Sequence, residues 1–190
     1  MGYTVTEYVN DLHKLRARKL DDAAMMAAVK PLAKKLAEDG SWFKEKMMEI
    51  NTDMGVGISL LHEEDDHSLT VISVAWSKDN LDVPPHDHGT WAVVAGVKGL
   101  ERNTLWRRQD DGSHAEPDYA EVAPVSHADI TLGDVIAMSP ADIHTVENVG
   151  EGVSLSLHTY GKNPNTTDRF QYDTQTNRAK ALKVDFKSMD

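Results

Sequence analysis

Between about residue 55 and residue 160 the chain consists of short strand-like segments separated by turns. This pattern restricts the fold more than any other feature of the sequence. About eight strands are expected, at 55–62, 68–76, 91–97, 99–106, 121–125, 133–138, 145–148 and 152–160. Short strands at such regular spacing predict a β-sandwich or a closed β-barrel.

The first fifty residues follow a helical pattern instead. Within 5–20, apolar residues recur every three or four positions, which predicts an amphipathic helix. Asp21 and Asp22 suit the N-cap of a second helix, and Gly40 suits its C-terminal end. Pro31 is expected to break that helix or to begin a new one, because proline fits a first turn but not an interior. A third, short helix is expected just after Gly40.

The length of 190 residues fits one domain with a full core. We therefore expect a single domain over 1–190, with a helical segment at 1–50, a barrel at 51–162 and a C-terminal extension at 163–190. The extension is rich in Asn, Thr, Asp and Lys and is expected to wrap around the barrel in an extended conformation.

Charge and composition exclude several classes of function. The net charge is −11, and residues 51–190 carry 11 basic against 23 acidic side chains, so a nucleic-acid partner is not expected. The absence of cysteine excludes disulfides, thiolate ligands and a cysteine nucleophile. No apolar run is long enough to span a bilayer and the N-terminus has no apolar signal core, so we expect no membrane association and a cytoplasmic location. Either a monomer or a homodimer fits these features.

Three of the nine histidines are spaced in a way that suggests a metal site. His86 and His88 lie two positions apart, so on an extended chain their imidazoles point to the same side. Alone, such a pair fits two structural histidines equally well. His144 strengthens the metal hypothesis because it lies in a second segment of strand and turn residues, 133–148.

The segments 84–91 (PPHDHGTW) and 133–148 (GDVIAMSPADIHTVEN), with Gly99 between them, resemble the two motifs of the cupin superfamily. The resemblance covers about residues 80–160. It implies a double-stranded β-helix barrel that binds a metal near one mouth, with the N-terminal helices packed outside.

The first cupin motif commonly supplies a glutamate four or five residues after its second histidine, where this chain has Ala92 and Val93. The resemblance then implies a metal held by His86, His88 and His144 alone. Imidazole suits iron, zinc, copper and nickel alike. A site that must accept both an anionic substrate and dioxygen favours Fe(II).

The last expected strand carries the second signal. Ser154, Ser156, His158 and Tyr160 share one of its faces, which lies either in solvent or, in a cupin barrel, in the interior. Together with three histidines lacking the glutamate and with the segment 169–173 (RFQYD), this strand resembles the thiol dioxygenases of the cysteine dioxygenase and 3-mercaptopropionate dioxygenase type. The resemblance implies that Ser156, His158 and Tyr160 form a catalytic relay beside the iron.

The residue that binds the substrate carboxylate is less clear from the sequence. This family commonly places an Arg or Gln on an early strand, where this chain offers Ser59 or His62. Neither is a bidentate partner for a carboxylate. Arg169 and Arg102 are the remaining candidates, although a surface arginine in the tail is an equally good interpretation of Arg169.

The leading hypothesis is an Fe(II)-dependent dioxygenase that oxidises a small thiol, of the cysteine or mercapto-carboxylate type, to its sulfinate with O₂. One alternative is a metal-dependent cupin lyase, isomerase or carbon-oxidising dioxygenase that acts on a small organic acid, with Tyr160 as general base. Another is a non-enzymatic ligand-binding cupin. A third is a barrel whose histidines are structural and hold no metal.

Overall fold

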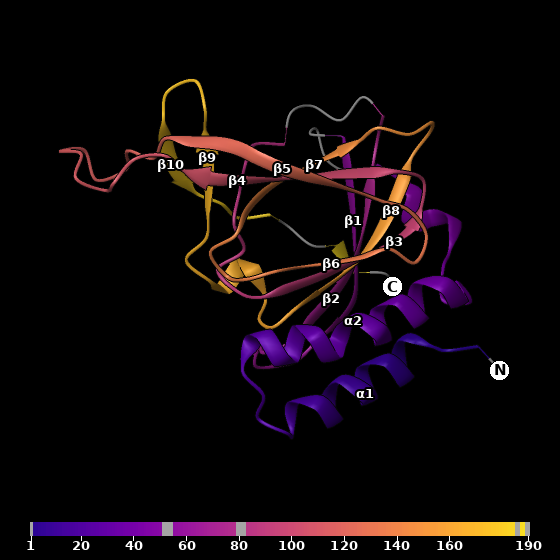
Figure 1. Ribbon diagram of the computed structural model, residues 1–190. Coiled ribbons are helices and arrows are strands. Elements are labelled where there is room, and N and C mark those ends of the chain that lie inside the picture. Colours follow the sequence, from indigo (N-terminus) through magenta and orange to yellow (C-terminus); the bar gives the residue numbers. More distant parts are fainter. Residues whose placement is uncertain (1, 51–54, 79–82, 185–186, 189–190) are drawn as a thin grey trace.

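The computed structural model describes residues 2–50, 55–78, 83–184 and 187–188. Two sheets face each other and enclose a barrel (Figure 1). The first has the strand order β11-β1-β2-β8-β3-β6, in which β11 is Lys187–Ser188, and the second has the order β5-β4-β7. Eight strands match the expected segments: β1 (Val56–Glu63), β2 (Thr70–Trp76), β3 (Ala92–Lys98), β4 (Glu101–Arg108), β5 (Val122–Ile130), β6 (Val135–Met138), β7 (Ile143–Asn148) and β8 (Ser154–Tyr160).

The order of the strands confirms the double-stranded β-helix predicted from the sequence. The chain crosses between the sheets, because β3 pairs with β6 and β8 whereas the next strand, β4, pairs with β5 and β7. Apolar side chains from both sheets meet in the interior, with Ile72 and Val94 from one and Ile130 and Val146 from the other. The fold is therefore an all-β barrel with helices added at its N-terminus.

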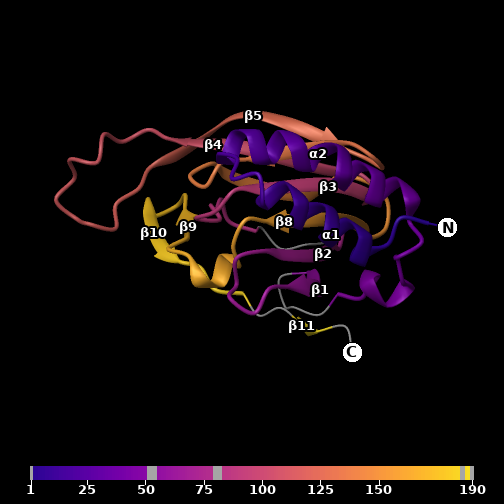
Figure 2. The ribbon, with the colours of Figure 1, turned by 90° about the horizontal axis from the view of Figure 1, so that it is seen from below.

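Two helices cover the outer face of the six-stranded sheet (Figures 1 and 2). Helix α1 (Val5–Arg16) begins with a capping box between Thr4 and Glu7. Helix α2 (Asp22–Asp39) begins at the N-cap Asp21 and ends at Gly40, whose φ of 64° is the left-handed conformation that glycine favours. The expected third helix is one short 3₁₀ turn, Glu45–Met48.

The expectation that Pro31 breaks the second helix is wrong. Pro31 lies on the exposed side of α2, and the helix continues through it. A proline inside a helix costs about 3 kcal/mol. The opposite side of α2 buries Val29 and Leu36 completely, and each buried side chain of this size contributes about 1.5–3 kcal/mol. Burial on both sides of the proline therefore outweighs the lost hydrogen bond.

Strand β8 lies between β2 and β3 and is buried on both faces. Leu155 and Leu157 pack under the helices, and the Thr159 hydroxyl is 2.6 Å from the hydroxyl of Tyr8 on α1. The other face, which begins at Ser154 and ends at Tyr160, points into the barrel. Of the two environments considered for this polar face, the structure shows the interior.

The tail is more regular than the expected extended wrap. It contains a short 3₁₀ turn, a hairpin and a strand that pairs with β1 in parallel: η2 (Pro164–Thr166), β9 (Phe170–Asp173), β10 (Arg178–Ala181) and β11 (Lys187–Ser188). The hairpin packs against the loop that carries the first two histidines, through hydrogen bonds from Tyr172 N to Pro85 O and from Asp87 N to Phe170 O. The expected start of the barrel at residue 51 lies outside the described residues.

No helix in the described part of the chain combines the length and the apolar character needed to cross a membrane.

Candidate metal centre

Backbone pairing brings the two histidine segments together. His86 and His144 lie 58 positions apart, and each donates its backbone N–H to the carbonyl of the other over 2.9 Å. This reciprocal pair is an isolated antiparallel bridge that joins His86 to β7. Because both bonds belong to the main chain, the fold itself holds these two backbone positions side by side.

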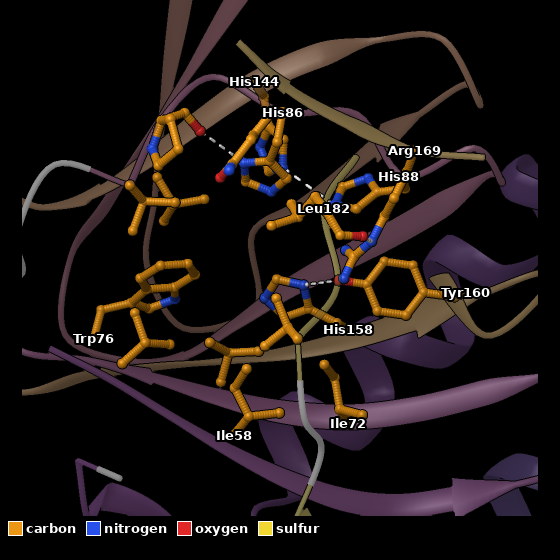
Figure 3. A pocket seen from close by; sticks show the side chains of 17 residues that line it. Ile58, Ile72, Trp76, His86, His88, His144, His158, Tyr160, Arg169 and Leu182 are labelled. Carbon is orange, nitrogen blue, oxygen red and sulfur yellow. Dashed lines mark hydrogen bonds between the residues drawn. The ribbon is translucent and has the colours of Figure 1, made fainter. Parts of the chain in front are cut away.

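The three imidazoles converge in the barrel (Figure 3). Ring centroids lie 5.3 Å apart for His86 and His88, 4.7 Å for His86 and His144, and 4.9 Å for His88 and His144. One ring nitrogen from each lies within 4.8 Å of the others, and all three residues are buried. The side-by-side placement predicted from the His-x-His spacing is confirmed.

Hydrogen bonds on the outer side of two of the three rings fix which nitrogen faces the centre, whereas Nδ1 of His88 has no partner among the described residues. Nδ1 of His86 is 3.0 Å from the carbonyl of Pro84, and Nδ1 of His144 is 3.1 Å from Oδ1 of Asn103. Both partners are acceptors, so Nδ1 carries the proton and the Nε2 lone pair points inward. Such outer hydrogen bonds are usual for histidines that bind metals. Burial lowers the pKa of His86 to about 4 and the pKa of His144 well below its ordinary value, so both rings are neutral.

The geometry of these rings fits a metal ion. Nε2 of His88 is 3.4 Å from Nε2 of His144. Two nitrogens that each bind one ion at about 2.1 Å lie about 3.0–3.4 Å apart for octahedral to tetrahedral angles. A cation between these two nitrogens would be bound by the Nε2 lone pair of each ring. His86, His88 and His144 could therefore hold a metal ion, and imidazole ligands leave its identity open.

Ser156, His158 and Tyr160 form a continuous hydrogen-bond chain along the inner face of β8. Ser156 Oγ is 2.9 Å from His158 Nε2, and His158 Nδ1 is 3.0 Å from the Tyr160 hydroxyl. The Tyr160 ring lies 5.1 Å from the ring of His88, which places the end of this hydrogen-bond chain beside the three histidines. Burial lowers the pKa of His158 to about 3 and raises the pKa of Tyr160 well above its ordinary value.

Arg169 points into the same pocket, toward Tyr160 (Figure 3). Only 5% of this residue is exposed, so it is not a surface arginine of the tail. Its Nε donates to the Leu182 carbonyl over 3.1 Å and its Nη2 donates to Asn165 Oδ1 over 3.0 Å, and both acceptors are uncharged. Burial lowers its pKa, and the carboxylate of Asp87 nearby opposes that shift. The arginine brings a positive charge to the pocket wall.

The pocket between these groups is small and largely apolar. Its volume of about 80 Å³ holds a few water molecules or a ligand of similar size. The polar lining consists mainly of the three histidines, His158, Tyr160 and Arg169, whereas the opposite wall is formed by aliphatic side chains: Val56, Ile58, Ile72, Val74, Leu182 and Val184. Two of these aliphatic residues and the arginine come from the tail, which therefore closes the mouth of the barrel.

The structure places the other expected substrate groups elsewhere. Arg102 makes two hydrogen bonds to Asp129, from Nε over 2.7 Å and from Nη2 over 2.8 Å, and it does not line the pocket. It points outward because it follows the inward-facing Glu101 on β4. The structure therefore does not bring Arg102 together with the other expected site residues. Ser59 and His62 are also absent from the described pocket lining.

His62 instead belongs to a second cluster, which sequence spacing gave no reason to expect. Its Nε2 is 2.9 Å from Glu64 Oε1, and Nε2 of His13 on α1 is 2.6 Å from the same oxygen. These three residues also satisfy the distances of a possible metal group, but they are partly exposed. Both imidazoles already have a carboxylate partner, so the hydrogen bonds between helix and barrel explain this cluster without a metal.

The sequence analysis missed Asn103, which orients His144. A signal was present, because Glu101, Asn103 and Leu105 share one face of β4, and Leu105 is paired with His144 on β7. The register between β4 and β7 was needed to use that signal.

Comparisons with known proteins show similarity in fold. No protein-family model matches the chain, and neither does any curated protein. Similar solved structures include oxalate oxidase in complex with the substrate analogue glycolate, with 16% identity and a TM-score of 0.46 over 64% of this chain and 60% of that one. A cupin family protein with a double-stranded β-helix fold from Methanocaldococcus jannaschii has 12% identity and a TM-score of 0.42, over 64% and 94% of the two chains.

Oxalate decarboxylase from Lactobacillus farciminis, in a formate complex, has 13% identity and a TM-score of 0.45 over 68% of this chain and 35% of that one. The chain spans about 60% of the length of the oxalate oxidase it matches. At this level of similarity none of these proteins indicates what this chain binds, and the resemblance to thiol dioxygenases stays a prediction.

Proposed function

We propose that the protein is a metal-dependent enzyme acting on a small organic acid, and that its substrate is a thiol acid oxidised to the sulfinate with O₂. One observation carries this proposal. The three imidazoles, the Tyr160 hydroxyl and the Arg169 guanidinium all line one small buried pocket. A ligand that fills it can contact all of them at once.

Fe(II) is the proposed metal, held by His86, His88 and His144. Three neutral ligands leave the ion its full charge and open positions, and iron supplies redox chemistry that no side chain of the pocket provides. Each substrate molecule would take up one O₂, both atoms of which would end on sulfur. The aliphatic wall excludes water from the pocket and so strengthens the polar contacts inside it.

Arg169 is the proposed partner of the substrate carboxylate. Its guanidinium is held by two uncharged acceptors, so it keeps N–H groups and a positive charge for an anion. The overall charge of −11 repels anionic ligands, which makes a buried local cation more important for binding. Tyr160 is proposed to donate a hydrogen bond to the reacting ligand, with its hydroxyl oriented by His158.

A second candidate is a metal-dependent lyase, isomerase or carbon-oxidising dioxygenase on an acid without a thiol. One observation favours it, namely that the described pocket lining contains no group that would select sulfur. Selection of a thiol would then depend on the metal alone. The solved structures similar in fold include an oxidase and a decarboxylase of oxalate.

An oxygen-uptake screen of the iron-loaded protein separates these candidates. We expect uptake with 3-mercaptopropionate, cysteine or mercaptosuccinate, one sulfinate for each O₂ consumed, and little uptake with cysteamine, which lacks a carboxylate. Loss of oxalate or glycolate without sulfinate would support the second candidate. If none of these acids were turned over, the result would favour a ligand-binding protein without enzymatic activity.

Substitution of Arg169 tests the carboxylate contact within the same screen. Arg169→Met should raise KM for the carboxylate thiols about tenfold or more, because a charged hydrogen bond is lost, while metal content stays the same. Arg102→Met is the matched control and should leave KM unchanged. Equal effects of the two substitutions would contradict the proposed role of Arg169.

A further inference from the structure

Glu101, the first residue of β4, is the most deeply buried carboxyl group among the described residues. Only 1% of it is exposed, and its side chain lies inside the barrel. Neither carboxyl oxygen has a hydrogen bond of good geometry to another described residue. A buried carboxyl group without a partner is costly. Its nearest polar neighbours therefore indicate what it does.

Those neighbours are the hydroxyls of Ser154 and Ser156 on β8. Glu101 thus reaches from the three-stranded sheet across the barrel to the six-stranded sheet. The Ser154 hydroxyl likewise lacks a hydrogen-bond partner among the described residues, so a small rotation of these side chains satisfies the carboxyl group and the hydroxyl together. Burial raises the pKa of Glu101 to about 8, which keeps the carboxyl group protonated at neutral pH and able to donate.

Ser156 is also the inner end of the chain that leads to Tyr160, so Glu101 extends this chain by one member. The indole N–H of Trp76 already donates to Ser156 Oγ over 3.4 Å. If Glu101 also donates to Ser156 Oγ, both lone pairs of that oxygen are occupied. The Ser156 proton must then go to His158 Nε2, which is 2.9 Å away.

The directions of the remaining hydrogen bonds follow from the position of the Ser156 proton. His158 carries its proton on Nδ1 and donates it to the Tyr160 oxygen, 3.0 Å away. The Tyr160 proton cannot point back to His158 and is left for the pocket. If His158 instead carried its proton on Nε2, the Tyr160 hydroxyl would donate to His158 Nδ1 and could not donate to a ligand.

We propose that Glu101 is a positioning residue that closes the inner end of the Ser156–His158–Tyr160 chain and turns the Tyr160 hydroxyl proton toward the pocket. Glu101 touches no ligand and acts through the two residues between. The catalytic consequence rests on the proposed function, whereas the proton position on His158 does not.

The first test is therefore independent of activity. Nitrogen-15 NMR of the zinc-substituted protein reports which ring nitrogen of His158 carries the proton. We expect the Nδ1–H form alone in the wild type and in Glu101→Gln, whose amide also donates, and a mixture of both forms in Glu101→Leu. Ser73→Ala is the control, because it removes a buried hydroxyl of β2 that has no hydrogen-bond partner among the described residues. It should keep the Nδ1–H form.

Should Glu101→Leu not fold, Ser156→Ala tests the same link, since it separates Glu101 from His158 and should also give the mixture. An unchanged Nδ1–H form in Glu101→Leu, or in Ser156→Ala where the leucine variant does not fold, would overturn the proposal. So would an Nε2–H form in the wild type.

The second test uses turnover. Glu101→Leu should lower kcat about tenfold with little change in KM or metal content, and Glu101→Gln should restore most of it. In the background of Tyr160→Phe, Glu101→Leu should have no further effect on kcat, because it acts through the missing hydroxyl. Independent, multiplicative effects would show that Glu101 stabilises the barrel without positioning Tyr160. An inactive wild type with the expected NMR result would refute the proposed function and keep the position of the proton.

Discussion

The two groups of possible metal ligands differ in what their nitrogens already bind. In the barrel, Nε2 of His88 faces Nε2 of His144 at 3.4 Å, and both rings are buried. At the surface, His13 and His62 both contact Glu64 Oε1, and 45% of the His13 side chain is exposed. The three buried imidazoles converge without a carboxylate partner among the described residues, whereas both imidazoles of the surface group share the carboxylate of Glu64.

The difference shows that proximity alone does not define a metal site. Exposed imidazole–carboxylate pairs contribute little to the free energy of folding, and water readily replaces either partner. In the barrel, the backbone bridge between His86 and His144 and the hydrogen bonds to Pro84 and Asn103 hold the rings in one orientation. A buried, oriented set of ligands binds a metal more tightly than a mobile one.

Substitution of one histidine in each group gives the largest expected contrast. His144→Ala should reduce the metal content from about one ion per chain to none, because two imidazoles do not hold the ion against exchange. His13→Ala should leave it unchanged. Elemental analysis after gel filtration measures both, and an equal loss in the two variants would contradict the distinction between the groups.

Removal of the metal gives a contrast in stability. Metal in large excess over its Kd should raise the melting temperature of the wild type by about 10 °C, since binding to the folded state alone stabilises it. The shift should be absent in His144→Ala and full in His62→Ala. Calorimetry with and without a chelator measures it, and a shift that survives in His144→Ala would point to binding at another place.

Acidification of the metal-free protein gives the smallest contrast. Burial lowers the pKa of His86 to about 4 and of His158 to about 3, from an ordinary value of 6.5. Below pH 6.5 the unfolded chain therefore binds more protons than the folded one, and the free energy of unfolding falls as the pH falls toward these values.

The melting temperature should thus decrease between about pH 7.5 and pH 5. The decrease should be smaller in His158→Gln, which removes one of the buried imidazoles, and unchanged in His13→Gln. A pH dependence equal in all three proteins would show that the buried imidazoles do not control acid stability.

The barrel and the histidine triad could be predicted because they depend on local patterns. Alternation along β8 and the His-x-His spacing each fix the side to which an extended segment points its side chains, without reference to distant segments. Pro31 was mispredicted for the opposite reason. Whether a helix tolerates a proline depends on the face that it buries against a sheet far away in sequence, and local propensity contains no information about that face.

The two arginines show the same limit within the site. Arg102 was expected near the substrate from its strand, yet the alternation of β4 points it at Asp129. Arg169 could not be distinguished from a surface residue, because its burial depends on how the tail packs over the barrel. Likewise, Glu101 could be recognised as a neighbour of Ser156 only once the two sheets were placed face to face.

Two parts of the chain form the pocket, and each contributes different groups to its lining. The barrel supplies the histidines and Tyr160, while Arg169, Leu182 and Val184 come from the segment that follows it. Substitutions in that segment can therefore alter which molecule fits the pocket while leaving the group of three histidines intact. Related sequences that keep the barrel motifs but differ after residue 163 would be expected to share the histidine group and to differ in the molecule that they bind.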